Sequence, residues 1–331
     1  MAAALILFFI LIAAVLGWLA IQNGSYHISR SRIIKTSPEV AFEAVSDFKT
    51  WPEWTPWLAH ERDCKIDYSD TTKTEGSWYS WNGKIIGAGK MTHDKFTAPN
   101  QIESRIEFLR PMRSKSDVYW KFNPVEGGTE VTWGMRGKMP FFFRWMAAKM
   151  DQWVGKDYEI GLNNLAMTLN DNSNAFDLSF DGLIESPAQY YISTAFSGTF
   201  AELPNAMQKA YPELMAAVED NELDVAGEPF TLYNKVNIKK DFLSCDIAVP
   251  VSNKTNIDGF TNAILPARTY SRTTLKGDYT NLELAWHSAF SNLRMNKLRF
   301  HWKHPILERY ITNPRTSEGM ELVTYLDIPL K

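Results

Sequence analysis

The sequence predicts an α+β fold: an N-terminal transmembrane helix, an antiparallel sheet around a long C-terminal helix, and a pseudo-two-fold duplicated β-α-β-β domain. Residues 2–21 are apolar and carry no charge. Residues 76–137 alternate apolar and polar side chains with the period of two that is typical of half-buried strands. Two similar segments fill the last half of the chain, which indicates an internal repeat. The expected divisions are an anchor at 1–23, a first domain at 24–170, a linker at 171–184 and a second domain at 185–331.

The composition is that of a globular protein, with 45% apolar and 22% charged residues. A net charge of −3 without a basic run argues against a nucleic-acid partner. Cys64 and Cys245 lie far apart, so a disulfide framework is not expected. His301 and His304 are three residues apart but no third ligand follows, so no metal is expected. No cofactor is expected either, because no phosphate-binding glycine loop is present.

The first apolar stretch is long enough to cross a membrane. Twenty helical residues span about 30 Å, the thickness of a hydrocarbon core. A cleaved signal peptide is the alternative, but it requires a cationic start and a shorter apolar run. Arg30, Arg32 and Lys35 follow the stretch, and by the positive-inside rule they place the rest of the chain in the cytoplasm. We therefore expect a single-pass membrane protein with cytoplasmic domains.

Residues 24–170 show a short helix, an antiparallel sheet and a long closing helix. Ser37-Pro38-Glu39 has the pattern of an N-cap, a first-turn proline and a first-turn acid. The segment 51–57 contains two prolines and is expected to form an aromatic loop. Its tryptophans, Trp54 and Trp57 among them, either plug the end of a core or line the mouth of an apolar pocket. Apolar positions from 143 to 169 recur at helical spacing and predict one long amphipathic helix.

This part of the chain resembles the START-like superfamily of polyketide cyclases and lipid-transfer proteins, also called SRPBCC. The resemblance covers about residues 27–170, and it implies a helix-grip fold with a cavity between the sheet and the long helix. The superfamily includes binders, transporters and enzymes, so the resemblance implies a fold and no single activity. The residues that carry it are Ser37-Pro38-Glu39-Val40-Ala41-Phe42, Trp51-Pro52-Glu53-Trp54, Gly87-Ala88-Gly89, Gly128-Thr129-Glu130-Val131-Thr132-Trp133 and 155–165.

The repeat relates residues 190–251 to residues 269–330. Gly198 matches Gly277 at an offset of 79 (277 − 198), and the offset returns at the end of each copy. In the middle, Tyr233 matches Tyr310 at 77 (310 − 233). Each copy is expected to form a strand, a helix and two strands, joined into one sheet with both helices on one face. Such a domain has a natural cleft between its halves.

The second domain resembles the GyrI-like effector-binding domain of AraC- and MerR-type regulators. The resemblance implies binding of small, often aromatic or cationic molecules between the repeats, with a glutamate that can balance the ligand charge. Glu308 best matches that glutamate, and the first repeat has Thr231 there; a second acid of the family is replaced by Tyr325. The DNA-reading helices of those regulators are missing. The residues that carry the resemblance are Gly198-Thr199-Phe200-Ala201-Glu202-Leu203-Pro204, Gly227-Glu228-Pro229-Phe230, Leu232-Tyr233, Leu275-Lys276-Gly277-Asp278-Tyr279, Glu308-Arg309-Tyr310 and Ile328-Pro329-Leu330.

Three hypotheses for function follow. In the first, two cavity-bearing domains at the membrane bind hydrophobic, amphipathic or cationic aromatic small molecules, with Tyr233, Trp286 and Tyr310 offering aromatic faces beside Glu308. In the second, the chain is an enzyme: a hydrolase using Glu308 as a general base, or a cyclase or lyase in the START-like cavity. In the third, it is a scaffold in which one domain has lost its pocket. No acid, base and nucleophile cluster in the sequence, so binding is favoured over catalysis and no catalytic residue is assigned.

Overall fold

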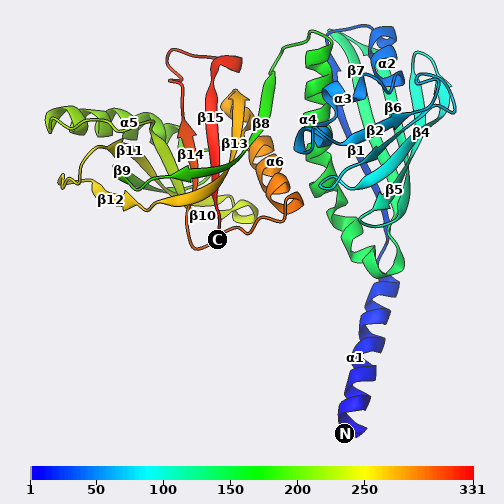
Figure 1. The fold of residues 1–331 in the computed structure, drawn as a ribbon, viewed down its shortest axis with the longest axis horizontal. Helices are drawn as coiled ribbons and strands as arrows, with labels where there is room; N and C mark the ends of the chain where they lie inside the picture. The colour runs from blue at the N-terminus through cyan, green and yellow to red at the C-terminus, as the bar shows by residue number, and fades with distance from the viewer. Residues whose placement is uncertain (1) are drawn as a thin grey trace. The chain divides into compact units, whose positions relative to one another are not determined.

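The structure is a computed structural model that describes residues 2–331. It divides into two compact units between Ser173 and Asn174, and each unit contains one antiparallel sheet. The predicted α+β class is confirmed, as are the N-terminal apolar helix and the long helix after the first sheet (Figure 1).

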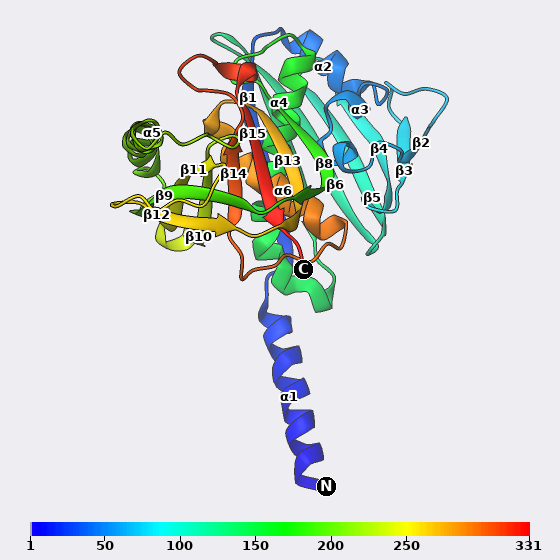
Figure 2. The same ribbon diagram turned by 60° about the vertical axis from the view of Figure 1, so that its left-hand side comes forward.

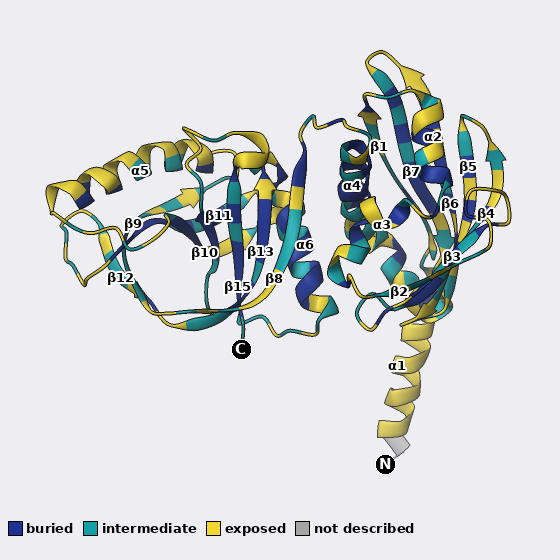
Figure 3. Ribbon diagram, turned by 45° about the horizontal axis from the view of Figure 1, so that its top comes forward, coloured by how far each residue is buried: buried dark blue, intermediate teal, exposed yellow. Residues whose placement is uncertain are grey.

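Helix α1 (Ala2–Ile21) is long and apolar enough to cross a bilayer, the single such helix found among residues 2–331. From residue 4 to its end its side chains are exposed with one exception, Leu19 (Figure 3). An exposed helix that is hydrophobic all round is typical of a membrane span rather than of a soluble surface.

Two of the cationic side chains that follow α1 form polar contacts within the first unit. Arg30 forms ion pairs with Asp151 and Glu159, at 2.8 and 2.6 Å. Arg32 donates a hydrogen bond of 3.1 Å to Asn163. Arg30 and Arg32 therefore have a structural role within the first unit. Their position after the helix is for that reason weaker evidence for the orientation of the chain in a membrane.

The first unit is a seven-stranded antiparallel sheet in the order β1-β7-β6-β5-β4-β3-β2 (Figure 2). The long helix α4 packs on it and contacts β1 and β7. Its elements are β1 (Ser25–Ile34), α2 (Pro38–Ser46), α3 (Trp51–Trp54), η1 (Pro56–His60), β2 (Lys65–Tyr68), β3 (Trp78–Asn82), β4 (Ala88–Thr97), β5 (Gln101–Arg110), β6 (Ser114–Val125), β7 (Gly128–Lys138), η2 (Phe141–Lys149) and α4 (Met150–Thr168).

Aromatic rings fill the space between this sheet and α4. The ring of Trp133 stacks on Tyr158 at 4.0 Å between centroids and on Trp120 at 4.5 Å. Trp54 meets Trp120 and Trp133 edge-on, and all four side chains are buried. Aromatic pairs in such offset and edge-on arrangements stabilise a core beyond their area burial. The rings therefore occupy the region where the resemblance implies a cavity.

Two local expectations for this unit are wrong. The segment expected to be a loop forms two short helical turns, because Pro52 and Pro56 stand in first turns, where no N–H donor is needed. The single helix expected from residue 143 is a 3₁₀ segment, η2, that passes into α4 at Met150. Several apolar side chains of η2 face solvent, so the helical spacing there does not mark a buried face.

The second unit is an eight-stranded antiparallel sheet in the order β12-β9-β11-β10-β14-β15-β13-β8. Helices α5 and α6 cover one face, α5 over β9 and β11 and α6 over β13 and β15. Strand β8 begins at Phe176 and pairs along its length with β13, so most of the expected linker 171–184 is part of the sheet. The remaining elements are β9 (Gln189–Gly198), α5 (Leu203–Asp220), β10 (Phe230–Asn237), η3 (Ile238–Lys240), β11 (Phe242–Val251), β12 (Thr261–Leu265), β13 (Arg268–Gly277), η4 (Tyr279–Asn281), α6 (Leu282–Met295), β14 (Ile306–Tyr310), η5 (Gly319–Glu321) and β15 (Val323–Pro329), with β8 ending at Ser186.

Candidate functional site

The carboxylate of Glu308 lies at the centre of the second unit, between the sheet and its helices. Glu308 is on β14, and its side chain is only 3% exposed. The register of the two central strands pairs it directly with Thr231 of β10. The side chains on either side of Glu308 along β14, at positions 307 and 309, point to the opposite face of the sheet, as strand geometry requires. The glutamate is therefore held on a rigid element under the helices.

Three donors surround this carboxylate. The indole Nε1 of Trp286, from α6, donates to Oε1 at 2.6 Å. The hydroxyls of Tyr233 and Tyr310 donate to Oε2, each at 2.8 Å. The Tyr310 hydroxyl also lies 3.1 Å from Oγ1 of Thr231. The structure thus brings together four of the six predicted site residues around one buried acid.

Two further tyrosines complete the aromatic group. The rings of Tyr211, from α5, and Tyr279 lie edge-on to the ring of Tyr310, at 6.2 and 5.8 Å between centroids. The Tyr211 hydroxyl is buried, with Thr231 as its polar neighbour. The helical spacing of the sequence places both tyrosines on the inward faces of the two predicted helical segments. A tyrosine on such a face, where most residues are apolar, is the pattern from which their part in the site could have been predicted.

Burial controls the protonation of the group. It raises the pKa of Glu308 above the ordinary value, while the hydrogen bonds from Trp286, Tyr310 and Tyr233 act in the opposite direction. Burial and the nearby Glu308 raise the pKa of Tyr279 to about 12. No arginine, lysine or histidine forms an ion pair with Glu308 in the part of the chain that the structure describes. A carboxylate so placed takes up a proton, or it needs a cation from outside the chain.

The remaining two predicted residues, Trp54 and Trp57, belong to the first unit. Trp54 is part of the aromatic core described above. Trp57 is half-buried, its ring lies edge-on to Trp133, and its Nε1 donates to Oδ2 of Asp157 at 3.1 Å. Of the two interpretations of the tryptophan segment, these contacts favour core packing.

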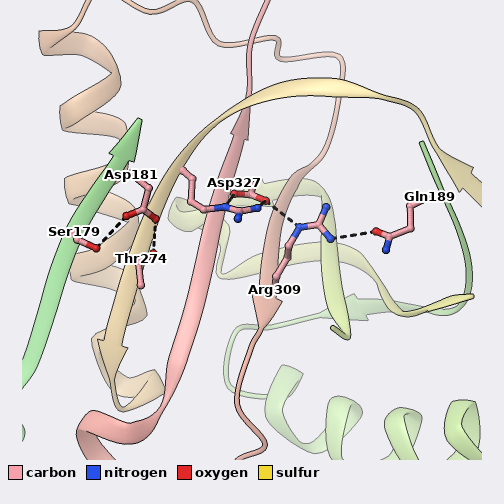
Figure 4. Close-up of polar contacts among 7 residues, drawn as sticks. Ser179, Asp181, Gln189, Thr274, Arg309 and Asp327 are labelled. Carbon is pink, nitrogen blue, oxygen red and sulfur yellow. Dashed lines mark hydrogen bonds and ion pairs between the residues drawn. The ribbon is translucent and has the colours of Figure 1, made fainter. Parts of the chain in front are cut away.

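A second polar group crosses the other face of the C-terminal sheet, and the sequence did not indicate it. Asp327 of β15 accepts two hydrogen bonds from Arg272, at 2.7 and 2.8 Å, and one from Arg309 at 3.0 Å. Nη1 of Arg309 in turn donates to Oε1 of Gln189, as Figure 4 shows. We call this line of side chains, from Arg272 through Asp327 and Arg309 to Gln189, the charged row. A cavity of about 470 Å³ lies over this row, and its lining includes both arginines and Tyr325. Because one buried carboxylate forms ion pairs with both guanidinium groups, these contacts first of all stabilise this face of the sheet.

The comparisons with solved structures give several similar folds. The C-terminal domain of EcmrR is 19% identical, with a TM-score of 0.41 over 47% of this chain and 98% of that chain. SAV2435, solved bound to tetraphenylphosphonium, is 14% identical, with a TM-score of 0.37 over 46% of this chain and 94% of that chain. Protein MLL2253 from Mesorhizobium loti is 15% identical, with a TM-score of 0.34 over 44% of this chain and 98% of that chain. No curated protein matches the sequence.

Two family models match, one to each unit. Residues 25–170 match the family described as polyketide cyclase / dehydrase and lipid transport. Residues 183–331 match the family described as the GyrI-like small molecule binding domain. The chain therefore carries a region that matches the polyketide cyclase / dehydrase and lipid transport family, followed by a region that matches the GyrI-like small molecule binding domain family.

Proposed function

We propose that this protein is a membrane-anchored binder of small molecules whose GyrI-like domain takes up lipophilic cations at Glu308. The observation that carries the proposal is a buried carboxylate that receives three hydrogen bonds and has no cationic partner among the described residues. Helix α1 is the membrane anchor of this proposal, with the two domains on the cytoplasmic side.

The group around Glu308 suits a cation with an apolar surface. The three donors stabilise the ionised carboxylate, and a bound positive charge offsets the cost of burying it. Tyr211, Tyr233, Tyr279 and Trp286 add aromatic faces, which attract cations electrostatically. Both oxygens of Glu308 are already engaged by donors, so the arrangement favours binding over the alternative of general-base hydrolysis.

The described arrangement is closed, and binding requires an opening. Glu308 is almost fully buried, whereas Trp286 is half-buried on α6. Of the three donors, Trp286 is the one carried by a covering helix and not by a central strand. In the proposal, the ligand enters by displacing Trp286 and replaces its contact with Oε1. The two halves of the domain, β9-α5-β10-β11 and β13-α6-β14-β15, are proposed repeats that meet at the Thr231–Glu308 pair.

Two ions of nearly equal shape and opposite charge test the proposal. The full chain in neutral detergent is expected to bind tetraphenylphosphonium, detected by quenching of tryptophan emission and by calorimetry against matched empty micelles. Tetraphenylborate is expected not to bind at this site. Glu308→Gln should weaken phosphonium binding at least tenfold, about 1.4 kcal/mol, because the amide keeps the shape of the side chain but not its charge. Glu318→Gln, at the exposed residue that precedes η5, serves as the matched control. Equal binding of both ions, or binding unaffected by Glu308→Gln, would refute the proposal.

The proposed cation binding should also depend on pH, in a direction set by Glu308. Since burial raises the pKa of Glu308, the proton competes with the cation at higher pH than it would for an exposed glutamate. Below that pKa the affinity is expected to fall by up to about tenfold per pH unit. Titrations of tetraphenylphosphonium from pH 8 down to pH 4 measure the effect, and a flat profile would show that Glu308 is not the group that pairs with the cation.

A further inference from the structure

One end of the sheet in the first unit is tied to the end of α1. Helix α1 ends at Ile21 and β1 begins at Ser25, so the connection spans at most roughly 14 Å when fully extended. The register pairs Ser25 with Lys138, at the end of β7, and Gly137 with Ser116, near the start of β6. The β5–β6 turn and η2 therefore lie at the same end of the sheet as the end of α1.

Hydrogen bonds fix η2 beside this connection. The backbone N–H of Met139 donates to the carbonyl of Gly24 at 2.8 Å. Nη1 of Arg144, within η2, donates to the carbonyl of Ala20 at 3.3 Å. The latter is one of the last carbonyls of α1, which have no partner within the helix. The segment that leads into α4 is thus held against the last turn of the apolar helix.

The surface around this junction is aromatic and cationic. Phe142 is 65% exposed, and Phe143, Trp145 and Leu109 are each 40% exposed or more. We call these four residues the anchor-end surface. Trp18, in the last turn of α1, is exposed as well. Three exposed cations stand at the same end of the unit: Arg113, Lys138 and Lys149.

We propose that the anchor-end surface docks on an anionic phospholipid bilayer, with its aromatic side chains in the headgroup layer. The proposal rests on the membrane anchoring proposed above for α1. Tryptophan is enriched at the membrane–water interface, where its ring is apolar and its N–H stays in contact with water. Phenylalanine and leucine on an interfacial surface enter the boundary between headgroups and acyl chains. Lysine and arginine beside a span are attracted to anionic headgroups. If α1 crosses the bilayer, the short connection keeps Ser25, at this end of the sheet, within roughly 14 Å of the end of the span. Arg144 of η2 is hydrogen-bonded to the last turn of α1, so the bilayer is the occupant that is already in reach.

The same geometry supplies a control position. Val125 is exposed to 38% and stands at the other end of β6. The eleven steps from Ser114 to Val125 place it roughly 37 Å further along the strand. Docking as proposed leaves Val125 in water, although it belongs to the same sheet and is apolar.

Depth-dependent fluorescence tests the docking. Cys64 and Cys245 are replaced by alanine in the full chain, and single cysteines are introduced as Phe142→Cys, Leu109→Cys, Val125→Cys and Leu11→Cys. Each is labelled with nitrobenzoxadiazole and reconstituted in nanodiscs of phosphatidylcholine and phosphatidylglycerol, with or without brominated acyl chains. The labels at 142 and 109 are expected to emit at shorter wavelength than the label at 125 and to lose at least half of their intensity in brominated nanodiscs.

The position within α1 separates failure of docking from failure of anchoring. Quenching at position 11 together with water-like emission at 142 and 109, equal to that at 125, would overturn the docking while α1 remains a membrane span. Absence of quenching at position 11 would instead show that α1 does not enter the bilayer. That result would overturn the docking and the membrane anchoring by α1, whereas cation binding at Glu308 has its own test.

Discussion

Replacing Asp327 by asparagine is expected to destabilise the C-terminal domain by about 3–5 kcal/mol. The Asp327 carboxylate has no exposed surface and forms ion pairs with both Arg272 and Arg309. Nη2 of Arg309 already lacks a hydrogen-bond partner among the described residues. Without the carboxylate, Arg309 keeps its 3.3 Å hydrogen bond to Gln189 and its position over the Phe230 ring, at 5.3 Å. Its buried charge then has no ion-pair partner among the described residues. Denaturant-dependent hydrogen exchange of peptides from β13, β14 and β15 measures the loss.

Asp246→Asn is the matched control for this substitution. Asp246 lies on the same face of the sheet, is half-buried, and accepts a hydrogen bond from Asn234, with no ion pair to any residue that the structure describes. Its replacement should cost less than about 1 kcal/mol. Adding Arg309→Met to Asp327→Asn should restore part of the lost stability, since it removes one of the uncompensated charges. Equal small effects of both single substitutions would mean that the charged row contributes little to stability.

The regular parts of both folds follow from local patterns in the sequence. Alternation along Ile102, Ser104 and Ile106 correctly marks the buried face of β5. The N-cap at Ser37 is present, with its hydroxyl 3.4 Å from the N–H of Val40. These signals are local, because a side chain's face is set by its own strand or helix period. The resemblance of each half to a known family supplied the rest of the fold.

The Glu308 group was predictable in part. Tyr310 is two residues from Glu308 on the same strand and therefore on the same face, and Trp286 stands on the inward face of its helix. Their convergence depends on which strands lie at the centre of the sheet, and the family resemblance indicated this. Tyr211 lies on α5 and Tyr279 on η4, just before α6. The sequence pattern placed both on inward helical faces but did not mark them as part of the Glu308 group.

Contacts that depend on strand register could not be predicted from the sequence. Asp327 meets Arg309 diagonally across β14 and β15, and a shift of one residue would turn it to the helix face. The pairing of β8 with β13, which replaces most of the expected linker, is equally non-local. Periodicity also gave no means of telling the exposed aromatic residues of η2 from the buried ones of α4, since both follow helical spacing.

Acidification from pH 7 to pH 4 is expected to destabilise the N-terminal domain by about 3 kcal/mol through His93. The ring has no exposed surface and stacks on Phe48 at 3.8 Å between centroids. Its Nε2 lies 3.0 Å from the carbonyl oxygen of Ser46, which can only accept, so this nitrogen carries the proton. Nδ1 then accepts from the hydroxyl of Ser104 at 2.9 Å. The environment thus suits the neutral imidazole, and burial lowers the pKa of His93 to about 4.

The sign follows from the two pKa values. The unfolded chain binds a proton at this histidine near pH 6.5, the folded domain only near pH 4. Stability is therefore greatest above pH 6.5 and falls by up to about 1.4 kcal/mol per pH unit between these values. Urea unfolding of the full chain, followed by tryptophan emission, reports mainly on this domain, because all tryptophans except Trp286 and Trp302 precede residue 174.

The non-titrating variant His93→Gln isolates the effect. Its amide can keep a donor near Ser46, so it should be less stable than the parent at pH 7 but should lose little further stability between pH 6.5 and pH 4.5. Below pH 4.5 the carboxylates of Asp47, Glu61 and Asp171, whose pKa values are lowered in the folded domain, contribute losses of their own in both proteins. If the parent and His93→Gln showed the same slope between pH 6.5 and pH 4.5, the buried imidazole would not be the group that links folding to protons.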